Sequence, residues 1–192
     1  MRLLPILAAA VATAAAVPCA AQDFAGPRIE ANVGYDRLDA ETGIAGAPDK
    51  AQGVRLGAAV GYDVAVSPNF FIGAEAGIGW SLDDRERVTV GTTRASIDSG
   101  RDIDLSLRLG ARVAPRTLLY AKAGYANTQF EGAVRTGATL TRVEDDEDGY
   151  RLGAGVEHML NDRLFVKGEY RFTDYGDDVQ RHQALVGFGV RF

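Results

Sequence analysis

Eight segments of this chain alternate between apolar and polar residues, and this pattern restricts the possible folds more than any other feature. The clearest is 102–114, where Ile, Leu, Ala and Val alternate with Asp, Ser, Arg and Gly. The last eleven residues, 182–192, alternate in the same way and end on Phe192. A period of two is typical of β-strands. The predicted strands are 28–36, 53–65, 70–83, 102–114, 118–130, 149–160, 164–174 and 182–192.

The connections between these segments alternate in length, which indicates how the strands are joined. Three are short and rich in turn-forming residues, at 67–69, 115–117 and 161–163. Four are longer and polar, at 37–52, 84–101, 131–148 and 175–181. Short periplasmic turns and longer extracellular loops are typical of outer-membrane barrels. We therefore predict an all-β fold, an eight-stranded antiparallel transmembrane β-barrel, with the last strand pairing with the first because lipid cannot satisfy an open edge.

The strands of soluble barrels also alternate between apolar and polar residues, but they direct their apolar residues inward. Two features favour the opposite orientation here. Aromatic residues such as Tyr62, Trp80 and Tyr125 belong to the apolar set and lie toward strand ends, as girdle residues do. The polar set is rich in glycine, which would leave room for long charged side chains in a narrow interior. Strand bulges or curvature explain some of these glycines equally well. We expect the apolar face to contact lipid.

The N-terminus resembles a secretory signal peptide. Met1-Arg2 is followed by an apolar run over 3–17 and then by the small-residue triplet Cys19-Ala20-Ala21. We predict cleavage between Ala21 and Gln22, so that 1–21 is removed and 22–192 forms one barrel domain. A membrane anchor is disfavoured because the run is shorter than the ~20 residues that a spanning helix needs. A lipoprotein is disfavoured because Pro18 precedes Cys19.

A family resemblance becomes specific toward the C-terminus. Residues 153–176, GAGVEHMLNDRLFVKGEYRFTDYG, and the strand that ends on Phe192 resemble the last hairpins of the small porin-like outer-membrane β-barrel family. That family includes OmpX, the opacity proteins and the barrel half of OmpA. The resemblance implies a place in the outer membrane of a Gram-negative cell envelope. It also implies that Phe192 is an assembly signal read by the barrel-assembly machinery.

Charged residues on the predicted inner face are closely balanced in sign, which suggests a lumen charge network. The candidates are Glu30, Arg55, Glu75, Asp104, Arg108, Arg112, Lys122, Arg151, Glu157, Lys167, Glu169 and Arg171, and Asp36, Asp63, Asp102 and Arg191 face the same way. One interpretation is a salt-bridged plug, in which buried charges compensate one another. The other is a narrow selective pore.

The sequence gives little support for catalysis, calcium binding, a cofactor or nucleic-acid binding. Outer-membrane lipid A deacylases pair a His with a Ser two residues on, but Leu160 and Ala184 occupy those positions after His158 and His182. The acidic run 144–148 lacks the spaced ligands and the central glycine of a calcium loop, so we expect a solvated loop. Divalent ions could bridge this loop to the phosphates of lipopolysaccharide. No cofactor is expected, and a net charge of −5 gives no attraction to nucleic acid.

Together these features predict a non-enzymatic barrel that supports envelope integrity and offers its extracellular loops for surface interaction. The competing hypothesis is a small porin-like channel for small solutes. The expected partners are outer-membrane lipid and lipopolysaccharide, the barrel-assembly machinery and a surface ligand bound through the loops.

Overall fold

The computed structural model describes residues 24–40, 50–82, 86–90, 93–136, 139–176 and 179–192. The predicted signal peptide and its cleavage site, Ala21 and Gln22, lie outside the described residues. The strands are β1 (Gly26–Ala40), β2 (Lys50–Ala65), β3 (Phe70–Ser81), β4 (Glu86–Val90), β5 (Thr93–Ala114), β6 (Thr117–Thr136), β7 (Thr139–Met159), β8 (Leu164–Asp174) and β9 (Val179–Arg191). Within these ranges, no helix is long and apolar enough to cross a membrane.

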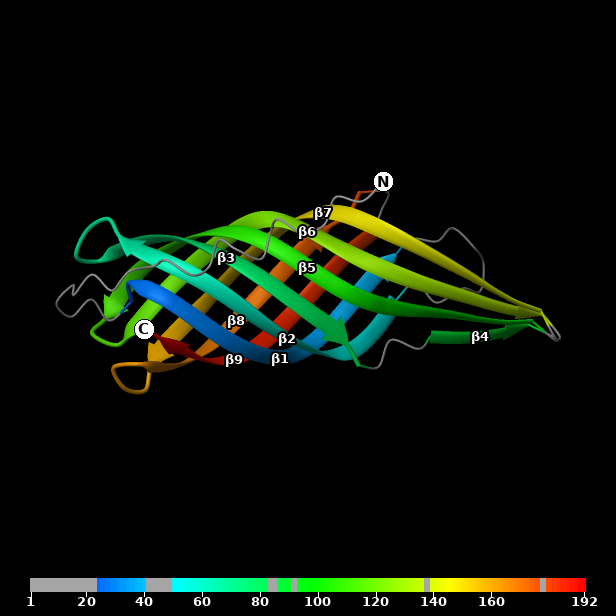
Figure 1. The fold of residues 1–192 in the computed structure, drawn as a ribbon, viewed down its shortest axis with the longest axis horizontal. Helices are drawn as coiled ribbons and strands as arrows, with labels where there is room; N and C mark the ends of the chain where they lie inside the picture. The colour runs from blue at the N-terminus through cyan, green and yellow to red at the C-terminus, as the bar shows by residue number, and fades with distance from the viewer. Residues whose placement is uncertain (1–23, 41–49, 83–85, 91–92, 137–138, 177–178) are drawn as a thin grey trace, which may run out of the picture.

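Eight of these strands form a closed antiparallel barrel, which confirms the predicted fold class (Figure 1). Each strand pairs with its neighbours in the order β3-β2-β1-β9-β8-β7-β6-β5, and β3 pairs with β5 to close the ring. The short strand β4 lies outside the ring, where it pairs with β5 alone among the described strands. Closure leaves no open edge within the ring, as lipid requires.

The first and last strands of the barrel pair along their full length, as predicted. The register runs from Arg28↔Arg191 to Ala40↔Val179. At the start of this ladder, the Phe192 amide donates to the carbonyl of Pro27 at 3.0 Å. Gly26 has a φ of 104°, and a Cβ there would lie 2.6 Å from the Phe192 carbonyl oxygen. Only glycine fits this junction of the two ends of the barrel.

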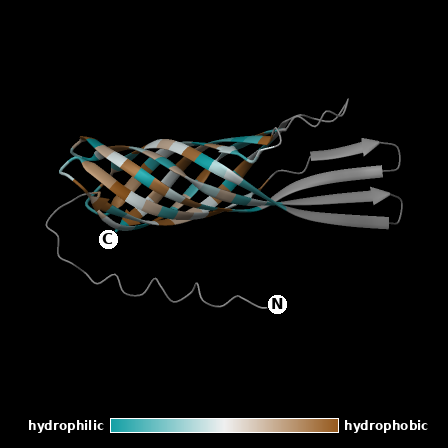
Figure 2. Ribbon diagram, turned by 90° about the horizontal axis from the view of Figure 1, so that it is seen from above, coloured by the Kyte–Doolittle hydropathy of each residue, from teal (hydrophilic) through white to brown (hydrophobic). Residues whose placement is uncertain are grey.

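The two faces of the strands differ as the alternation predicts. On β5, Leu105, Leu107 and Leu109 are 63–66% exposed, whereas Asp104 and Arg108 are buried. Figure 2 shows hydrophobic and hydrophilic residues alternating along the barrel strands. An outer surface this apolar is unfavourable in water but is suited to the hydrocarbon of a bilayer.

The short turns lie together at the end of the barrel that contains the C-terminus (Figure 1). They span 66–69, 115–116 and 160–163. In the last of them, Asn161 Oδ1 accepts hydrogen bonds from the amides of Arg163 and Leu164 at 2.9 and 2.8 Å. This side chain fixes the turn together with the backbone bond from the Leu160 amide to the Leu164 carbonyl at 2.8 Å. We take this end as periplasmic, by the rule that such barrels keep their short turns there.

The prediction of long loops at 84–101 and 131–148 was wrong over most of their length. β4 occupies 86–90, β5 begins at Thr93, β6 continues to Thr136 and β7 begins at Thr139. These segments contain many Thr and Val residues, whose branched side chains favour extended backbone. The acidic run 144–148 therefore lies in β7, paired with 127–131 of β6.

Candidate functional site

The barrel interior concentrates the charged side chains of the chain. Among the described residues, nine cations and eight carboxylates are buried there, and we call them the interior charge network. The cations are Arg28, Arg55, Arg108, Lys122, Arg151, Lys167, Arg171, Arg181 and Arg191, and the carboxylates are Glu30, Asp36, Asp63, Glu75, Asp102, Asp104, Glu157 and Glu169. Each occupies an inward position of its strand, because the side-chain period of two that exposes the apolar residues turns the polar ones inward.

At the periplasmic end of the network, two carboxylates hold three guanidinium groups. Asp63 Oδ2 accepts from Arg28 Nε at 3.0 Å, from Arg191 Nη2 at 2.8 Å and from Arg108 Nη1 at 3.3 Å. Glu157 accepts from Arg108 Nη2 at 2.7 Å and from Arg191 Nε at 2.8 Å. Such charge-assisted bonds are stronger than neutral ones. They tie β1, β2, β5, β7 and β9 together.

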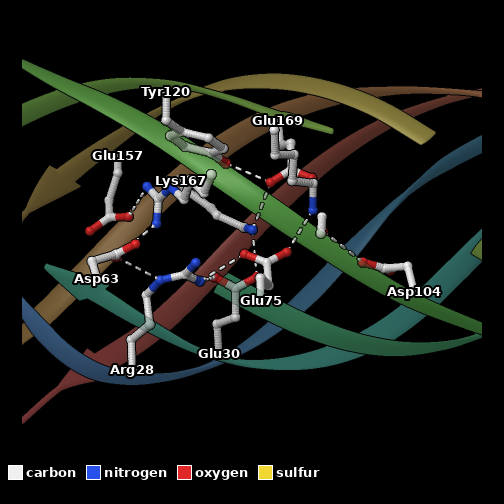
Figure 3. A network of polar contacts seen from close by, with 12 residues as sticks. Arg28, Glu30, Asp63, Glu75, Asp104, Tyr120, Glu157, Lys167 and Glu169 are labelled. Carbon is white, nitrogen blue, oxygen red and sulfur yellow. Dashed lines mark hydrogen bonds and ion pairs between the residues drawn. The ribbon is translucent and has the colours of Figure 1, made fainter. Parts of the chain in front are cut away.

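The middle of the network centres on Glu75 and Glu169. Glu75 accepts from Arg28 Nη1 at 2.8 Å and from Lys122 Nζ at 2.6 Å. Lys122 also contacts Glu169 at 2.8 Å, and Lys167 Nζ donates to Glu169 at 2.8 Å. Figure 3 shows Arg28, Glu75 and Glu169 converging from different strands. The bridging lysine therefore links two carboxylates that the sequence separates widely.

One aromatic residue, Tyr120, and one acidic residue, Glu30, extend the middle of the network. Tyr120 donates from its hydroxyl to Glu169 at 2.6 Å (Figure 3), and its ring lies 3.8 Å from the guanidinium carbon of Arg108. Glu30 pairs with Lys167 and lies 3.4 Å from Arg28. The ring face gives Arg108 a favourable cation–π contact in addition to its carboxylate partners.

Toward the extracellular end of the network, the hydrogen-bond acceptors are aspartates. Asp102 accepts from Arg151 Nη2 at 2.9 Å and lies 2.6 Å from Arg55 Nη1. Asp104 accepts from Arg151 Nη1 at 2.9 Å and from Arg171 Nη1 at 3.4 Å. Arg151 thus connects the two carboxylates, and the network continues through Arg171 to the middle layer.

Two glycines make space for these long side chains, as the sequence suggested. A Cβ at Gly79 would lie 1.8 Å from Arg55 Nη2, and a Cβ at Gly73 would lie 2.0 Å from Asp63 Oδ1. Both distances are far shorter than any real contact. In an eight-stranded barrel, the interior is only wide enough for side chains to fill. The two glycines leave the space that the side chains of Arg55 and Asp63 occupy.

An apolar seal closes the interior below the network at the periplasmic end. It consists of Phe24, Phe71, Leu118, Met159 and Phe165. The ring centroids of Phe24 and Phe71 are 5.8 Å apart in an edge-to-face arrangement. The carbonyl of Phe24 accepts from Nη1 of Arg191 at 2.7 Å, so the segment before β1 is held inside the mouth of the barrel.

The seal was not predicted from the sequence, although a signal was present. Phe71, Leu118 and Phe165 each precede by two residues an inward position, Gly73, Tyr120 or Lys167. They therefore share the inward face of their strands. Counting the period of two to the strand ends would have placed them inside the barrel.

Of the twelve charges predicted for the network, the structure buries eleven and pairs each with an opposite charge. Arg112 differs. It is half-buried, and its guanidinium carbon lies 5.6 Å from the ring centroids of both Phe24 and Phe71. The prediction that Arg112 is one of the paired charges was wrong. Arg112 lies four residues after Arg108 along β5, beside the apolar seal and not beside the carboxylates.

Two cations of the network, Arg28 and Arg181, were not predicted. Arg28 lies two residues before Glu30, and Arg181 lies two residues before Gln183, so both share the inward face. Arg181 pairs with Asp36 on β1 across 145 residues of sequence. The predicted strands began too close to these residues for their orientation to be assigned.

The outer rim of the barrel carries hydrogen-bonded tyrosines. Tyr150 donates to Asp174 at 3.0 Å, and Tyr125 donates to Asp148. Asp148 lies beyond these tyrosines toward the extracellular end, and hydrogen bonds from Tyr125 and Asn127 lower the pKa of its carboxyl. Tyrosines of this kind mark the boundary between hydrocarbon and headgroups.

The two histidines lie apart. His158 is at the periplasmic end of β7, where Nδ1 lies 3.1 Å from Thr117 Oγ1. His182 is at the extracellular end of β9, where Nδ1 lies 2.6 Å from the hydroxyl of Tyr170. The two imidazoles cannot contribute to one site. Among the described residues, no group of three or more His, Cys, Asp and Glu residues could hold a metal ion.

Comparison with known proteins adds independent information. Residues 6–192 match the family described as outer membrane protein beta-barrel domain. The 25 kDa outer-membrane immunogenic protein of Brucella ovis is 29% identical over 121 residues, which cover 61% of this chain and 52% of that protein. The 31 kDa outer-membrane immunogenic protein of Brucella melitensis is 28% identical over 44% of this chain and 42% of its own length. The matched part therefore spans about half the length of these relatives.

Solved structures show the same fold. Ail, the attachment invasion locus protein of Yersinia pestis, superimposes with a TM-score of 0.58 at 12% identity, covering 88% of this chain and 99% of Ail. Neisserial surface protein A superimposes with a TM-score of 0.59 at 13% identity, covering 87% of this chain and 97% of that protein. At such low identity the likeness concerns the fold alone.

Proposed function

The chain belongs to the outer membrane protein beta-barrel domain family, and on that premise we propose that it is a non-enzymatic barrel that supports envelope integrity and presents extracellular strands for surface interaction. Its location is the outer membrane. Because one fold serves many functions, the proposal depends on the interior and on the strands outside the membrane.

The filled interior is the observation that carries the structural role. The interior charge network spans the middle of the barrel, and the apolar seal closes its periplasmic end. Water-filled pores need wider barrels, whereas eight strands leave room only for side chains. Opposite charges held at 2.6–3.0 Å have no tendency to separate for a passing solute, since each would lose its partner in a confined space.

The strands beyond the barrel support the surface role. β4 and the outer parts of β5, β6 and β7 form an extracellular sheet, residues 86–90, 93–100, 129–136 and 139–149 (Figure 1). Among the described strands, β8 pairs with β7 only from Tyr150 onward. The edge of β7 over 139–149 and the outer edge of β4 are therefore available to pair with an added strand.

The predicted partners fit this arrangement. The apolar outer surface would contact lipid, and the rim tyrosines would lie among lipopolysaccharide and headgroups. Phe192 is 70% exposed, so the folded barrel makes little use of it for packing, which agrees with recognition by the barrel-assembly machinery. Relatives from Brucella are named immunogenic outer-membrane proteins, which supports the proposal that part of this chain is exposed at the cell surface.

The alternative is a small porin-like channel, which the polar interior favours. Planar-bilayer recordings separate the two. We expect the inserted protein to give no reproducible openings, because the network and the seal both obstruct the interior. Insertion is verified on the same sample by the β-sheet circular dichroism of the protein recovered from the bilayer lipid. Reproducible, charge-selective openings would contradict the structural role and establish the channel.

A deletion strain tests envelope integrity. We expect cells that lack the protein to lose viability at lower detergent concentrations than the parent, and the full chain to restore resistance. A variant in which the extracellular sheet is replaced by short turns should restore resistance equally, because the sheet lies outside the barrel. Unchanged detergent resistance in the deletion strain would argue against the envelope role and leave the surface role to be tested with the shortened variant.

A further inference from the structure

Gln183 is one of several interior residues whose buried polar atoms lack hydrogen-bond partners within the described ranges. Its side chain points inward from β9 and is only 1% exposed, yet neither its amide nitrogen nor its amide oxygen has a hydrogen-bond partner among the described residues. A buried amide without partners is costly. Such a group usually indicates that something else satisfies it.

Neighbouring arginines also have donors without acceptors. Nε of Arg55, Nη2 of Arg171 and Nη1 of Arg181 are all buried and unpartnered in the described part of the chain. Arg171 Nη2 lies 3.8 Å from the Glu75 carboxylate, which is beyond hydrogen-bond distance. Together with Gln183 Nε2, these groups supply four unused donors.

The register brings these residues to one region of the inner wall. Gln183 pairs with Arg171 of β8 on one side and with Asp36 of β1 on the other. Arg181 lies two residues along β9, on the same face. Arg55 reaches this wall from β2, which pairs with β1. We call Arg55, Arg171, Arg181 and Gln183 the donor patch. It spans four consecutive strands in the extracellular half of the barrel.

The electrostatics of the donor patch favour negative charge. Asp102 attracts the Arg55 guanidinium, but Arg151, Arg171 and Arg181 all repel it. Among the described residues of the interior, nine buried cations face eight buried carboxylates. Uncompensated charge in a region shielded from water is strongly unfavourable. One bound anion would neutralise the buried excess.

We propose that the donor patch binds one small inorganic anion of the size of chloride. Guanidinium and amide N–H groups are all donors, so the ligand must be an acceptor, and the narrow interior restricts it to a compact ion. Gln183 contributes a neutral donor that orients the ion without adding charge. The anion is a structural component of the outer half of the network.

Urea unfolding of the full barrel in neutral lipid vesicles tests the proposal, with fluorescence of Trp80, the one tryptophan of the chain, as the readout. Each protein is measured in sodium chloride and in sodium gluconate of equal ionic strength, because gluconate is too large for the patch. We expect the parent to unfold at a higher urea concentration in chloride than in gluconate. A ligand that binds only the folded state stabilises it in this way.

Two substitutions at the same position sharpen the test. Gln183→Glu places a tethered carboxylate in the patch, so we expect a higher midpoint than the parent in gluconate and no remaining difference between the salts. Gln183→Leu should unfold at a lower urea concentration than the parent and should also show no difference between chloride and gluconate. The matched control is Gln180→Leu on the same strand, where the side chain is exposed, and it should keep the parent's difference.

The comparison between variants removes general salt effects, since these act on all four proteins alike. An equal chloride-to-gluconate difference in the parent and in Gln183→Glu would overturn the proposal. So would a parent with no difference, which would mean that water alone satisfies the donors. Gln183→Glu keeps the test decisive even where Gln183→Leu does not fold.

Discussion

Replacing Leu107 by arginine is expected to lower the free energy of unfolding by about 2–4 kcal/mol, the cost of a cation near the middle of the bilayer. Leu107 is 66% exposed on the outer face of β5, so the new guanidinium would enter hydrocarbon. Urea titration of the protein folded into lipid vesicles, followed by the fluorescence of Trp80, measures the loss.

Leu82→Arg is the matched control, because Leu82 is also exposed but lies just beyond the extracellular end of β3. The same substitution there should cost only about 0–1 kcal/mol, since the side chain reaches the interface. Equal losses at Leu107 and Leu82 would mean that the membrane boundary does not lie between them.

Glu75→Gln is expected to cost about 3–5 kcal/mol, because it leaves buried cations without compensation. The carboxylate of Glu75 lies 2.8 Å from Arg28 and 2.6 Å from Lys122, and all three side chains are shielded from water. The neutral amide keeps the shape of the side chain but loses the charge. The same urea titration gives the change in stability.

Glu147→Gln provides the control for loss of a carboxylate, since Glu147 is exposed on β7. We expect a change within about 0.5 kcal/mol there, as for most surface positions. Adding Lys122→Met to Glu75→Gln should recover part of the loss, because it removes one of the stranded cations. If Glu75→Gln were as stable as the parent, the network would not be the element that holds the interior.

The local part of the fold could be predicted from the sequence. The alternation at 102–114 identified both the strand and its orientation, because a period of two assigns every side chain to one face. Pairing of the last strand with the first also followed, since lipid tolerates no open edge. The predicted loops at 131–148 failed because polar β-branched residues pair as readily above a membrane as within one.

The sequence could predict which residues belong to the candidate site, but not which of them pair. Glu75, Arg108 and Lys122 could be assigned to the interior by counting residues along a strand. Arg112 has the same inward parity but lies against aromatic rings, because depth along the barrel decides which charges meet carboxylates. Depth depends on the register of neighbouring strands, which a single strand does not encode.

The sequence by itself determined that this chain forms a lipid-exposed barrel and which side chains enter its interior, because alternation is a property of each strand alone. Only the tertiary structure decided which of those charges pair, as when Arg191 meets Asp63 across 128 residues of sequence. It alone placed Phe24 in the periplasmic mouth and left Gln183 without a hydrogen-bond partner among the described residues. These contacts arise when closure and register bring distant strands around a common interior, and no local pattern specifies them.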